Sequence, residues 1–274
     1  MVSQAAGSEA LSHHQRERPG PPSRRSASHE PAGGLVAAVL AHELRTPLAA
    51  FAVTLEVLRE AAELNSHDVQ RLIERLQHSS RWMEGVVSNL LTLSLLECDA
   101  RPLATVPMPA LAVVESAMQL VQPIVERHQQ RLRLLCPAPA AWIAADPSLL
   151  GQALVNLLTN ASTYGPAGEV IDVSVWTQTG QAELRVTDRG PGIPPAERER
   201  IFAPYVRGAA AHRSARGLGL GLYLARLIVE RHGGAIGVDS VVGRGASFWI
   251  RLPVVPAPAA GEPGSSRDES LAGG

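Results

Sequence analysis

Two long stretches with helical spacing of apolar residues open the chain, and they constrain its fold more than any other sequence feature. Between Leu35 and Leu58, leucine and phenylalanine side chains fall within roughly 80° of one another on a helix that turns about 100° per residue. A second stretch, from about Ser66 to Cys98, places apolar residues mostly at spacings of three and four. Two long amphipathic helices joined by a short polar break predict a helical hairpin.

The apolar surface of such a hairpin is too broad for one pair of helices to cover. Pairing with a second copy of the chain would bury the remainder in a four-helix bundle, so we expect a homodimer. Ser66 or Asp68 is expected to cap the second helix, because both side chains can accept a backbone N–H at a helix start.

The two ends of the chain differ in composition from its middle. Residues 1–33 are mostly polar and residues 254–274 return to Pro, Ala, Gly and Ser, so both segments are predicted to be disordered tails. The whole chain of 274 residues is 45% hydrophobic and 19% charged with a net charge of −1, which argues against a nucleic-acid partner. A length of this kind allows about two domains.

Nothing in the sequence predicts a membrane or secreted protein. No uncharged apolar run reaches the length of about 18 residues that a transmembrane helix needs, and no secretion signal is visible at the N-terminus. Cys98 and Cys136 lack the spacing of a metal site and are expected to be reduced thiols. We therefore expect a cytoplasmic protein.

The second half of the chain mixes helical and strand-like patterns. Residues 101–109 contain three prolines and are expected to link a hairpin domain, residues 34–100, to a second domain, residues 110–253. Helices and strands in segregated blocks predict an α+β two-layer sandwich with helices on one face of the sheet. The predicted helices cover 111–128, interrupted at Pro123, 146–164 and 218–232, and the predicted strands cover 132–135, 170–176, 183–188, 235–240 and 246–252.

The first helix carries an ionisable group outside its apolar stripe. His42 lies about 200° from Leu40 around the helix, so it faces away from that stripe. Thr46 follows one turn later on the same face, and Pro47 interrupts the backbone hydrogen bonding just after it, which predicts a local bend. Spacing alone leaves a solvated histidine and a reactive one both open.

Three stretches of the second half have the composition of ligand-binding segments. Asn156 and Asn160 share a helix face, and two amides there suit Mg²⁺ or phosphate oxygens as well as they suit an exposed polar pair. Asp188 ends a strand and precedes a glycine turn, where a carboxylate can accept an exocyclic amine while the backbone approaches a ring. The glycines of 217–221 open a helix, where N–H groups can reach phosphates, and the polar run 207–216 before them has the length of a mobile lid.

In this order and spacing, the stretches resemble the conserved boxes of sensor histidine kinases. His42 to Leu48 is similar to the H box, the asparagine helix to the N box, Asp188 to Gly192 to the G1 box, Phe202 to the F box and Gly217 to Gly221 to the G2 box. The resemblance covers about residues 35–253. It implies a dimerisation and phosphotransfer hairpin followed by an ATP-binding domain of the Bergerat or GHKL type, shared with gyrase, mismatch-repair and chaperone ATPases.

The resemblance also implies roles for residues of the hairpin. His42 would take the γ-phosphoryl group of ATP, and Glu43 would act as the general base. Thr46 matches the position that orients water when a phosphorylated response regulator is dephosphorylated. The implied partners are a second copy of the chain and the receiver domain of a response regulator. Because no sensor segment precedes His42, we expect either a fragment that lacks its sensor or a kinase that receives its signal from a separate sensor protein.

For the second domain, the resemblance implies a site for ATP and Mg²⁺. Asn156 and Asn160 would hold the metal and phosphates, with Asn160 the stronger candidate for the metal, and Asp188 would bind the adenine amino group. The remaining implied contacts are Tyr164 at the end of the N box, Gly190 and Gly192 along the base, and Gly217, Gly219 and Gly221 at the lid hinge and phosphates.

Three other functions fit part of the sequence. A dimeric scaffold could bind nucleotide without transferring phosphate, although intact His42, Glu43, Asn160 and Asp188 argue against a degenerate kinase. A gyrase-like ATPase or a serine kinase of the anti-sigma type would explain the nucleotide boxes. Neither function would explain the helical hairpin or His42.

One departure from the family pattern generates a prediction. Family members often carry a basic residue just before the tyrosine of the N box, where this chain has Thr163. We expect an arginine of the 207–216 segment, Arg216, to supply the missing phosphate contact. Arg216→Ala should therefore weaken ATP binding and slow phosphorylation; titration calorimetry and an initial-rate assay that both match the unaltered protein would rule this out.

Overall fold

A computed structural model describes residues 32–60, 65–98, 102–137, 141–206, 208 and 218–258, with the side chains of 32–44, 46 and 78 excepted. None of the helices in these ranges has the length and apolar content needed to cross a membrane. The elements in chain order are α1 Ala32–Glu60, α2 Ser66–Glu97, β1 Val106–Pro109, α3 Ala110–Arg127, β2 Arg131–Leu135, β3 Trp142–Ala145, α4 Pro147–Tyr164, β4 Val170–Gln178, β5 Gln181–Thr187, the 3₁₀ turns η1 Pro195–Glu197 and η2 Arg200–Phe202, α5 Gly221–Arg231, β6 Ala235–Ser240 and β7 Ala246–Val255.

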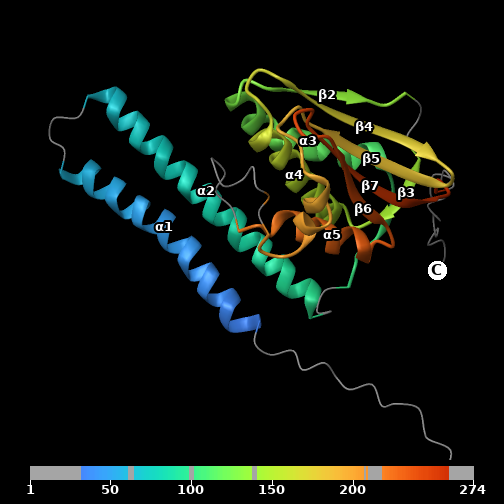
Figure 1. The fold of residues 1–274 in the computed structure, drawn as a ribbon, viewed down its shortest axis with the longest axis horizontal. Helices are drawn as coiled ribbons and strands as arrows, with labels where there is room; N and C mark the ends of the chain where they lie inside the picture. The colour runs from blue at the N-terminus through green and yellow to red at the C-terminus, as the bar shows by residue number, and fades with distance from the viewer. Residues whose placement is uncertain are drawn as a thin grey trace, which may run out of the picture. The chain divides into compact units, whose positions relative to one another are not determined.

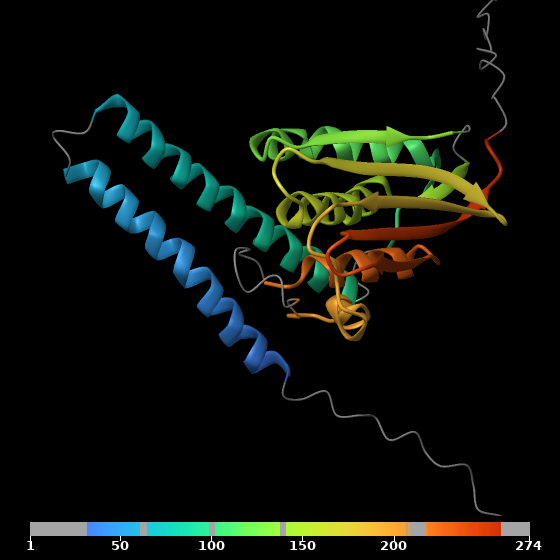
Figure 2. The same ribbon diagram turned by 45° about the horizontal axis from the view of Figure 1, so that its top comes forward.

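The first two helices form the predicted hairpin. From residue 40 onward, α1 runs antiparallel beside α2 (Figures 1 and 2). Asn65 caps α2, because its side-chain oxygen accepts the N–H of Asp68 at 2.9 Å. The prediction of Ser66 or Asp68 as the cap is therefore wrong, by one residue for Ser66 and by three for Asp68, since the cap must precede the first helical residue.

Strand β7 is the centre of a seven-stranded sheet. The strand order is β1-β3-β7-β5-β4-β2, and β6 also pairs with β7. One edge of β7 pairs with β5, while β6 and β3 pair with successive parts of the other edge. All pairings are antiparallel except that of β2 with β4.

Helices α3, α4 and α5 cover one face of this sheet (Figure 2). Each buries an apolar stripe at spacings of three and four, as in α4, whose buried residues include Leu150, Leu154, Leu157 and Leu158. The facing strand residues alternate along β4, where Ile171, Val173 and Val175 are buried. The predicted architecture, a helical hairpin followed by an α+β two-layer sandwich, is confirmed.

The structure departs from the sequence prediction at short elements. Residues 106–109, expected at the end of the linker, form β1 and pair with β3, which no pattern predicted. Both strands are only four residues long, and β1 contains two prolines, so neither shows the alternation of a longer strand. Helix α3 also continues through Pro123, which is exposed, instead of being interrupted there.

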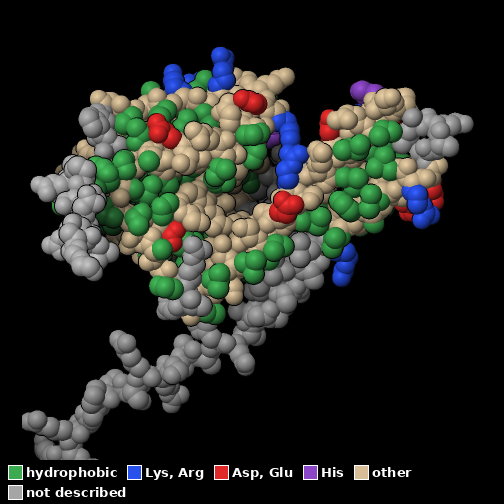
Figure 3. All heavy atoms as spheres, turned by 180° about the vertical axis from the view of Figure 1, so that it is seen from behind, with side chains coloured by type: hydrophobic (Ala, Val, Ile, Leu, Met, Phe, Trp, Pro, Cys, Tyr) green, Lys and Arg blue, Asp and Glu red, His purple; other side chains and the backbone are tan. Residues whose placement is uncertain are grey.

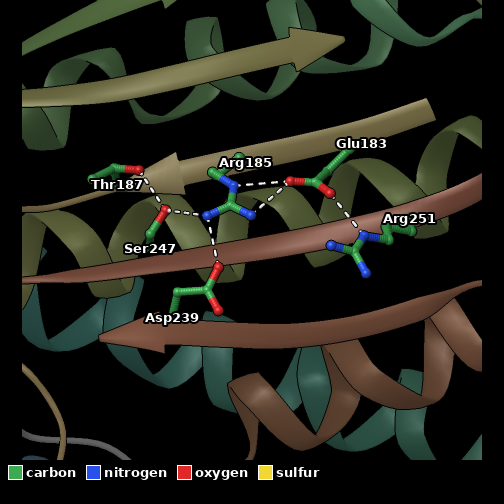
Figure 4. Close-up of polar contacts among 6 residues, drawn as sticks. All are labelled: Glu183, Arg185, Thr187, Asp239, Ser247 and Arg251. Carbon is green, nitrogen blue, oxygen red and sulfur yellow. Dashed lines mark hydrogen bonds and ion pairs between the residues drawn. The ribbon is translucent and has the colours of Figure 1, made fainter. Parts of the chain in front are cut away.

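The second face of the sheet carries a layer of paired charges in place of helices (Figure 4). Glu183 is only 6% exposed and lies between two arginines, with Arg185 Nη2 and Arg251 Nε each 2.7 Å from a carboxylate oxygen. Arg185 also reaches Asp239 at 2.8 Å. The arginines cover tryptophan rings, so aromatic area is shielded while the outer surface stays polar.

Candidate functional site

The polar face of α4 supplies the first wall of a cleft. Asn156, Asn160 and Tyr164 are spaced four residues apart and therefore follow one another on one helix face. All three line the cleft, whereas the leucines on the opposite face of α4 are buried in the core. The structure thus brings together the N-box residues that the sequence singled out.

Asp188 lies at the end of β5 and is 5% exposed. Its Oδ1 accepts the backbone N–H of Gly190 at 2.8 Å and that of Ala246 at 3.3 Å. Among the described residues, Oδ2 accepts no hydrogen bond, so one carboxylate oxygen remains available to a ligand. Burial raises the pKa of this carboxyl above its ordinary value, and the two backbone hydrogen bonds oppose that rise.

Two glycines of the loop after Asp188 are required by close backbone contacts. A Cβ on Gly190 would lie 2.7 Å from the carbonyl oxygen of Tyr164, at the end of α4. Gly192 has a positive φ of 72°, and a Cβ there would lie 2.2 Å from the carbonyl oxygen of Val241. The loop is therefore packed between α4 and the β6–β7 turn, and Gly192 lines the cleft.

The start of α5 forms the wall opposite the asparagines. The side-chain amide of Asn156 donates to the carbonyl oxygen of Gly221 at 3.1 Å, which joins α4 to α5. Gly219 has a φ of 68°, and a Cβ there would lie 2.6 Å from the carbonyl oxygen of Val206. Gly219 and Gly221 both line the cleft, while Arg216 and Gly217 lie outside the described residues.

The apolar floor of the cleft was not predicted. Phe202 is buried and packs edge-on against Phe248, with ring centroids 6.2 Å apart. Phe248 itself lines the cleft together with Ile193, Ile201 and Leu218. These are ordinary apolar residues of strands and loops, and only their positions next to the glycine boxes distinguish them in the sequence.

The residues predicted to accept and transfer the phosphoryl group lie in the helical hairpin. His42, Glu43 and Thr46 lie in α1, but their side chains are outside the described part of the structure. Their predicted roles therefore rest on the sequence.

The donor set of the cleft fits a hard cation. Asn160 makes no side-chain hydrogen bond to other described residues, and Asn156 uses only its Nδ2 in the contact with Gly221. Amide oxygens are ligands that Mg²⁺ accepts together with water and substrate phosphates. No group of three or more His, Cys, Asp and Glu side chains that could bind a metal occurs within the described ranges, so phosphates would have to complete the coordination.

Both parts of the chain match known families. Residues 145–256 match the family described as "Histidine kinase-, DNA gyrase B-, and HSP90-like ATPase", and residues 34–99 match the "His Kinase A (phospho-acceptor) domain".

Curated relatives match across both domains. The adaptive-response sensory kinase SasA of Synechococcus sp. is 32% identical over 222 residues, which cover 80% of this chain and 59% of SasA. The sensor-like histidine kinase SenX3 of Mycobacterium tuberculosis is 32% identical over 79% of this chain and 52% of SenX3. The chain therefore spans little more than half the length of these relatives.

Solved structures agree with the fold. ShkA, solved at full length in complex with AMPPNP, is 27% identical with a TM-score of 0.60 over 81% of this chain and 46% of ShkA. The histidine kinase ThkA, in complex with the response regulator protein TrrA, has a TM-score of 0.62 over 81% of this chain and 62% of ThkA, at 21% identity.

The geometry of Asp188 predicts a change in stability with pH. Because folding raises its pKa, the ionised carboxylate is disfavoured in the folded state, and this cost grows as pH rises from the unfolded pKa of about 3.9 through the folded pKa. Asp188→Asn keeps an oxygen for both backbone N–H groups and removes the charge. We expect urea unfolding to show that the variant is at least as stable as the unaltered protein at pH 7, with the difference vanishing below pH of about 3.9.

The same substitution should impair the cleft. An amide nitrogen in place of Oδ2 cannot accept a hydrogen bond from the adenine amino group. The affinity for ATP should therefore fall by about 10–100-fold in titration calorimetry. A variant that is less stable than the unaltered protein at pH 7 would contradict the assigned cause of the pKa shift.

Proposed function

Because the chain belongs to the family of histidine kinases that join a His Kinase A phospho-acceptor domain to a gyrase- and HSP90-like ATPase domain, we propose that it phosphorylates its own His42 with ATP. The observation that carries this proposal is one cleft to which the N, G1 and G2 boxes all contribute. The predicted site residues that line it are Asn156, Asn160, Tyr164, Asp188, Gly192, Gly219 and Gly221.

The adenine end of the cleft is proposed at the G1 loop. Asp188 Oδ2 accepts a hydrogen bond from the exocyclic amino group of adenine. Because the carboxylate is buried, this hydrogen bond is stronger than one made in water. Gly190 and Gly192 let the backbone approach the ring, and the apolar floor around Phe248 covers its faces. A relative of similar fold, ShkA, was solved with the ATP analogue AMPPNP, which supports this reading.

The phosphate end is proposed between α4 and α5. The side-chain oxygens of Asn160 and Asn156 would hold Mg²⁺, which would supply charge neutralisation at the phosphates. Gly219 and Gly221 bring backbone N–H groups toward the phosphates at the start of α5. The Asn156–Gly221 hydrogen bond fixes the position of the start of α5 relative to α4.

In the proposed transfer, an imidazole nitrogen of His42 attacks the γ-phosphorus of ATP. The bond from that phosphorus to the bridging oxygen breaks, ADP leaves, and Glu43 accepts the imidazole proton. The phosphoryl group then passes to an aspartate carboxylate of a response regulator. Thr46 orients the water that removes it from the regulator again.

The proposed domains follow the sequence prediction with two additions. Residues 34–100 form the phosphotransfer domain. Residues 110–253 form the ATP-binding domain together with β1, which pairs with β3 of its sheet, and with Val254 and Val255, the last residues of β7, which also pair with β3. A cytoplasmic location stays a prediction from the sequence.

The hairpin is proposed to form a homodimer. It leaves many large apolar side chains exposed, and Figure 3 shows green side chains gathered along it. A monomer gains nothing by exposing these apolar side chains, whereas a second hairpin would bury many of them in a four-helix bundle. The side chains concerned are Leu48, Val53, Leu55 and Val57 of α1 and Ile73, Val87, Leu91 and Leu95 of α2.

The kinase proposal predicts a loss of label from one variant. After incubation with γ-labelled ATP and Mg²⁺, the protein should carry acid-labile, alkali-stable phosphate, because phosphoryl on an imidazole nitrogen has that stability. His42→Gln should reduce the label to background while ATP affinity stays unchanged. His67→Gln, at the exposed start of α2, is the matched control and should keep full label.

Label that survives His42→Gln would falsify the proposal. Turnover of ATP without any protein label would instead favour a gyrase-like ATPase, and binding without turnover would favour a scaffold.

The dimer proposal predicts the mass of the protein in solution and a position, Leu91, at which a substitution should weaken the dimer. Light scattering should give twice the chain mass of 29.0 kDa. Leu91→Glu should raise the dimer dissociation constant by at least about 100-fold, because an unpaired carboxylate would be buried. Val241→Glu is the control, since Val241 is 58% and Leu91 61% exposed but Val241 lies in the β6–β7 turn. Equal dissociation constants for the two variants would place the interface elsewhere.

A further inference from the structure

A buried glutamine lies behind the nucleotide cleft and belongs to none of the family boxes. Gln130 follows α3 and precedes β2, and it is only 3% exposed. Its backbone N–H donates to the carbonyl oxygen of Val125 in the last turn of α3, at 3.0 Å. Gln129 before it has a positive φ of 58°, so the chain turns sharply here and directs residue 130 inward.

The Gln130 side chain binds the carboxyl end of α4. Its Nε2 lies 3.1 Å from each of three backbone oxygens, those of Ser162, Gly165 and Pro166. Its Oε1 accepts the hydroxyl of Ser162 at 2.7 Å. The amide orientation follows from these partners, because three carbonyl oxygens need a donor and only Nε2 has hydrogens.

These contacts satisfy a specific need of α4. The last carbonyl groups of a helix lack partners within the helix, and in a buried setting an unpaired carbonyl costs about 1–3 kcal/mol. Ser162 is 1% exposed, so water cannot serve its carbonyl. His128 Nδ1 lies 3.0 Å from the Ser162 hydroxyl and 3.1 Å from the Ser162 carbonyl oxygen, so Gln130, Ser162 and His128 form one polar cluster at the helix end.

The position of the α4 end matters for both ends of the cleft. Asn160 and Tyr164 lie in its last two turns and line the cleft. The carbonyl oxygen of Tyr164 packs against Gly190, with only 2.7 Å to a Cβ built there, and the Gly190 N–H donates to Asp188. A shift of the helix end would therefore move Asn160, at the proposed phosphate end of the cleft, and the loop after Asp188, at the proposed adenine end.

We propose that Gln130 is a positioning residue for ATP, acting through the α4 carboxyl end on Asn160 and on the Asp188 loop. The proposal rests on the proposed nucleotide site. Gln130 touches no substrate atom; it fixes the helix end from behind, so that the two halves of the site keep their separation. Groups that orient binding residues in this way typically contribute about 10–100-fold in affinity or activity.

The test compares the unaltered chain with Gln130→Leu, which keeps the side-chain volume and removes the side-chain hydrogen bonds. The dissociation constant for Mg·ATP and the KM for ATP in autophosphorylation should each rise about tenfold, while kcat at saturating ATP changes little. A merely structural role would lower the folded fraction, which reduces apparent kcat and leaves KM unchanged. Gln119→Leu, on the exposed face of α3, is the matched control and should alter neither constant.

The outcomes separate this inference from the proposed function. If the unaltered protein fails to bind Mg·ATP, the nucleotide site itself is wrong. If it binds and Gln130→Leu binds equally well with the same KM, the positioning role is overturned.

A second variant keeps the test decisive where Gln130→Leu does not fold. Ser162→Ala removes the hydroxyl that donates to Oε1 and that His128 Nδ1 also contacts, but it leaves the Nε2 contacts of Gln130 with backbone oxygens in place. The dissociation constant and KM should therefore rise about threefold, a smaller effect than loss of the whole amide. Unchanged constants in the folded Ser162→Ala protein would then overturn the proposal.

Discussion

Helix α4 has to be apolar on one face and polar on the other, because one face packs in the core and the other lines the cleft. The rest of the ATP-binding domain depends on this division. The leucines of α4 anchor the helix in the core, while its asparagines stay at the cleft. Its first turn is fixed by Asp146, which accepts two backbone N–H groups and whose own N–H donates to His232 at the end of α5. Its last turn is fixed by Gln130. Because polar side chains from other elements bind both helix ends, the cleft residues are held in place before any nucleotide arrives.

The sheet solves a different problem, since the helices of the described ranges cover only one of its faces. A bare second face would expose aromatic rings, and Trp176 and Trp249 do lie there. The guanidinium groups of Arg185 and Arg251 lie over these rings, and Glu183 pairs with both arginines from a nearly buried position. A buried carboxylate with one partner would be costly, but here two cations share it. The result is a polar layer one side chain thick that replaces a second layer of helices.

Local patterns in the sequence predicted the long elements, and they failed where distant partners define an element. The periodicity of α4 and the alternation of β4 are properties of neighbouring residues, so both could be predicted. Strands β1 and β3 exist because they pair with each other and with β7, and nothing in four residues signals that. Likewise, the glycine turn after Asp188 is a local pattern, and it singled out this carboxylate as a candidate for ligand binding. The role of Gln130 could not be predicted, because its partners are backbone carbonyls about thirty residues away in the chain.

The order of the strands has a consequence for how the protein is made. Strand β7 is the last described strand in the chain but lies in the middle of the sheet. It also completes the cleft, because Ala246 donates to Asp188 and Phe248 forms the floor. During synthesis from the N-terminus, β5 must therefore emerge with an unpaired edge and wait for β7. The cleft therefore cannot form in a nascent chain until β7 has left the ribosome and paired with β5.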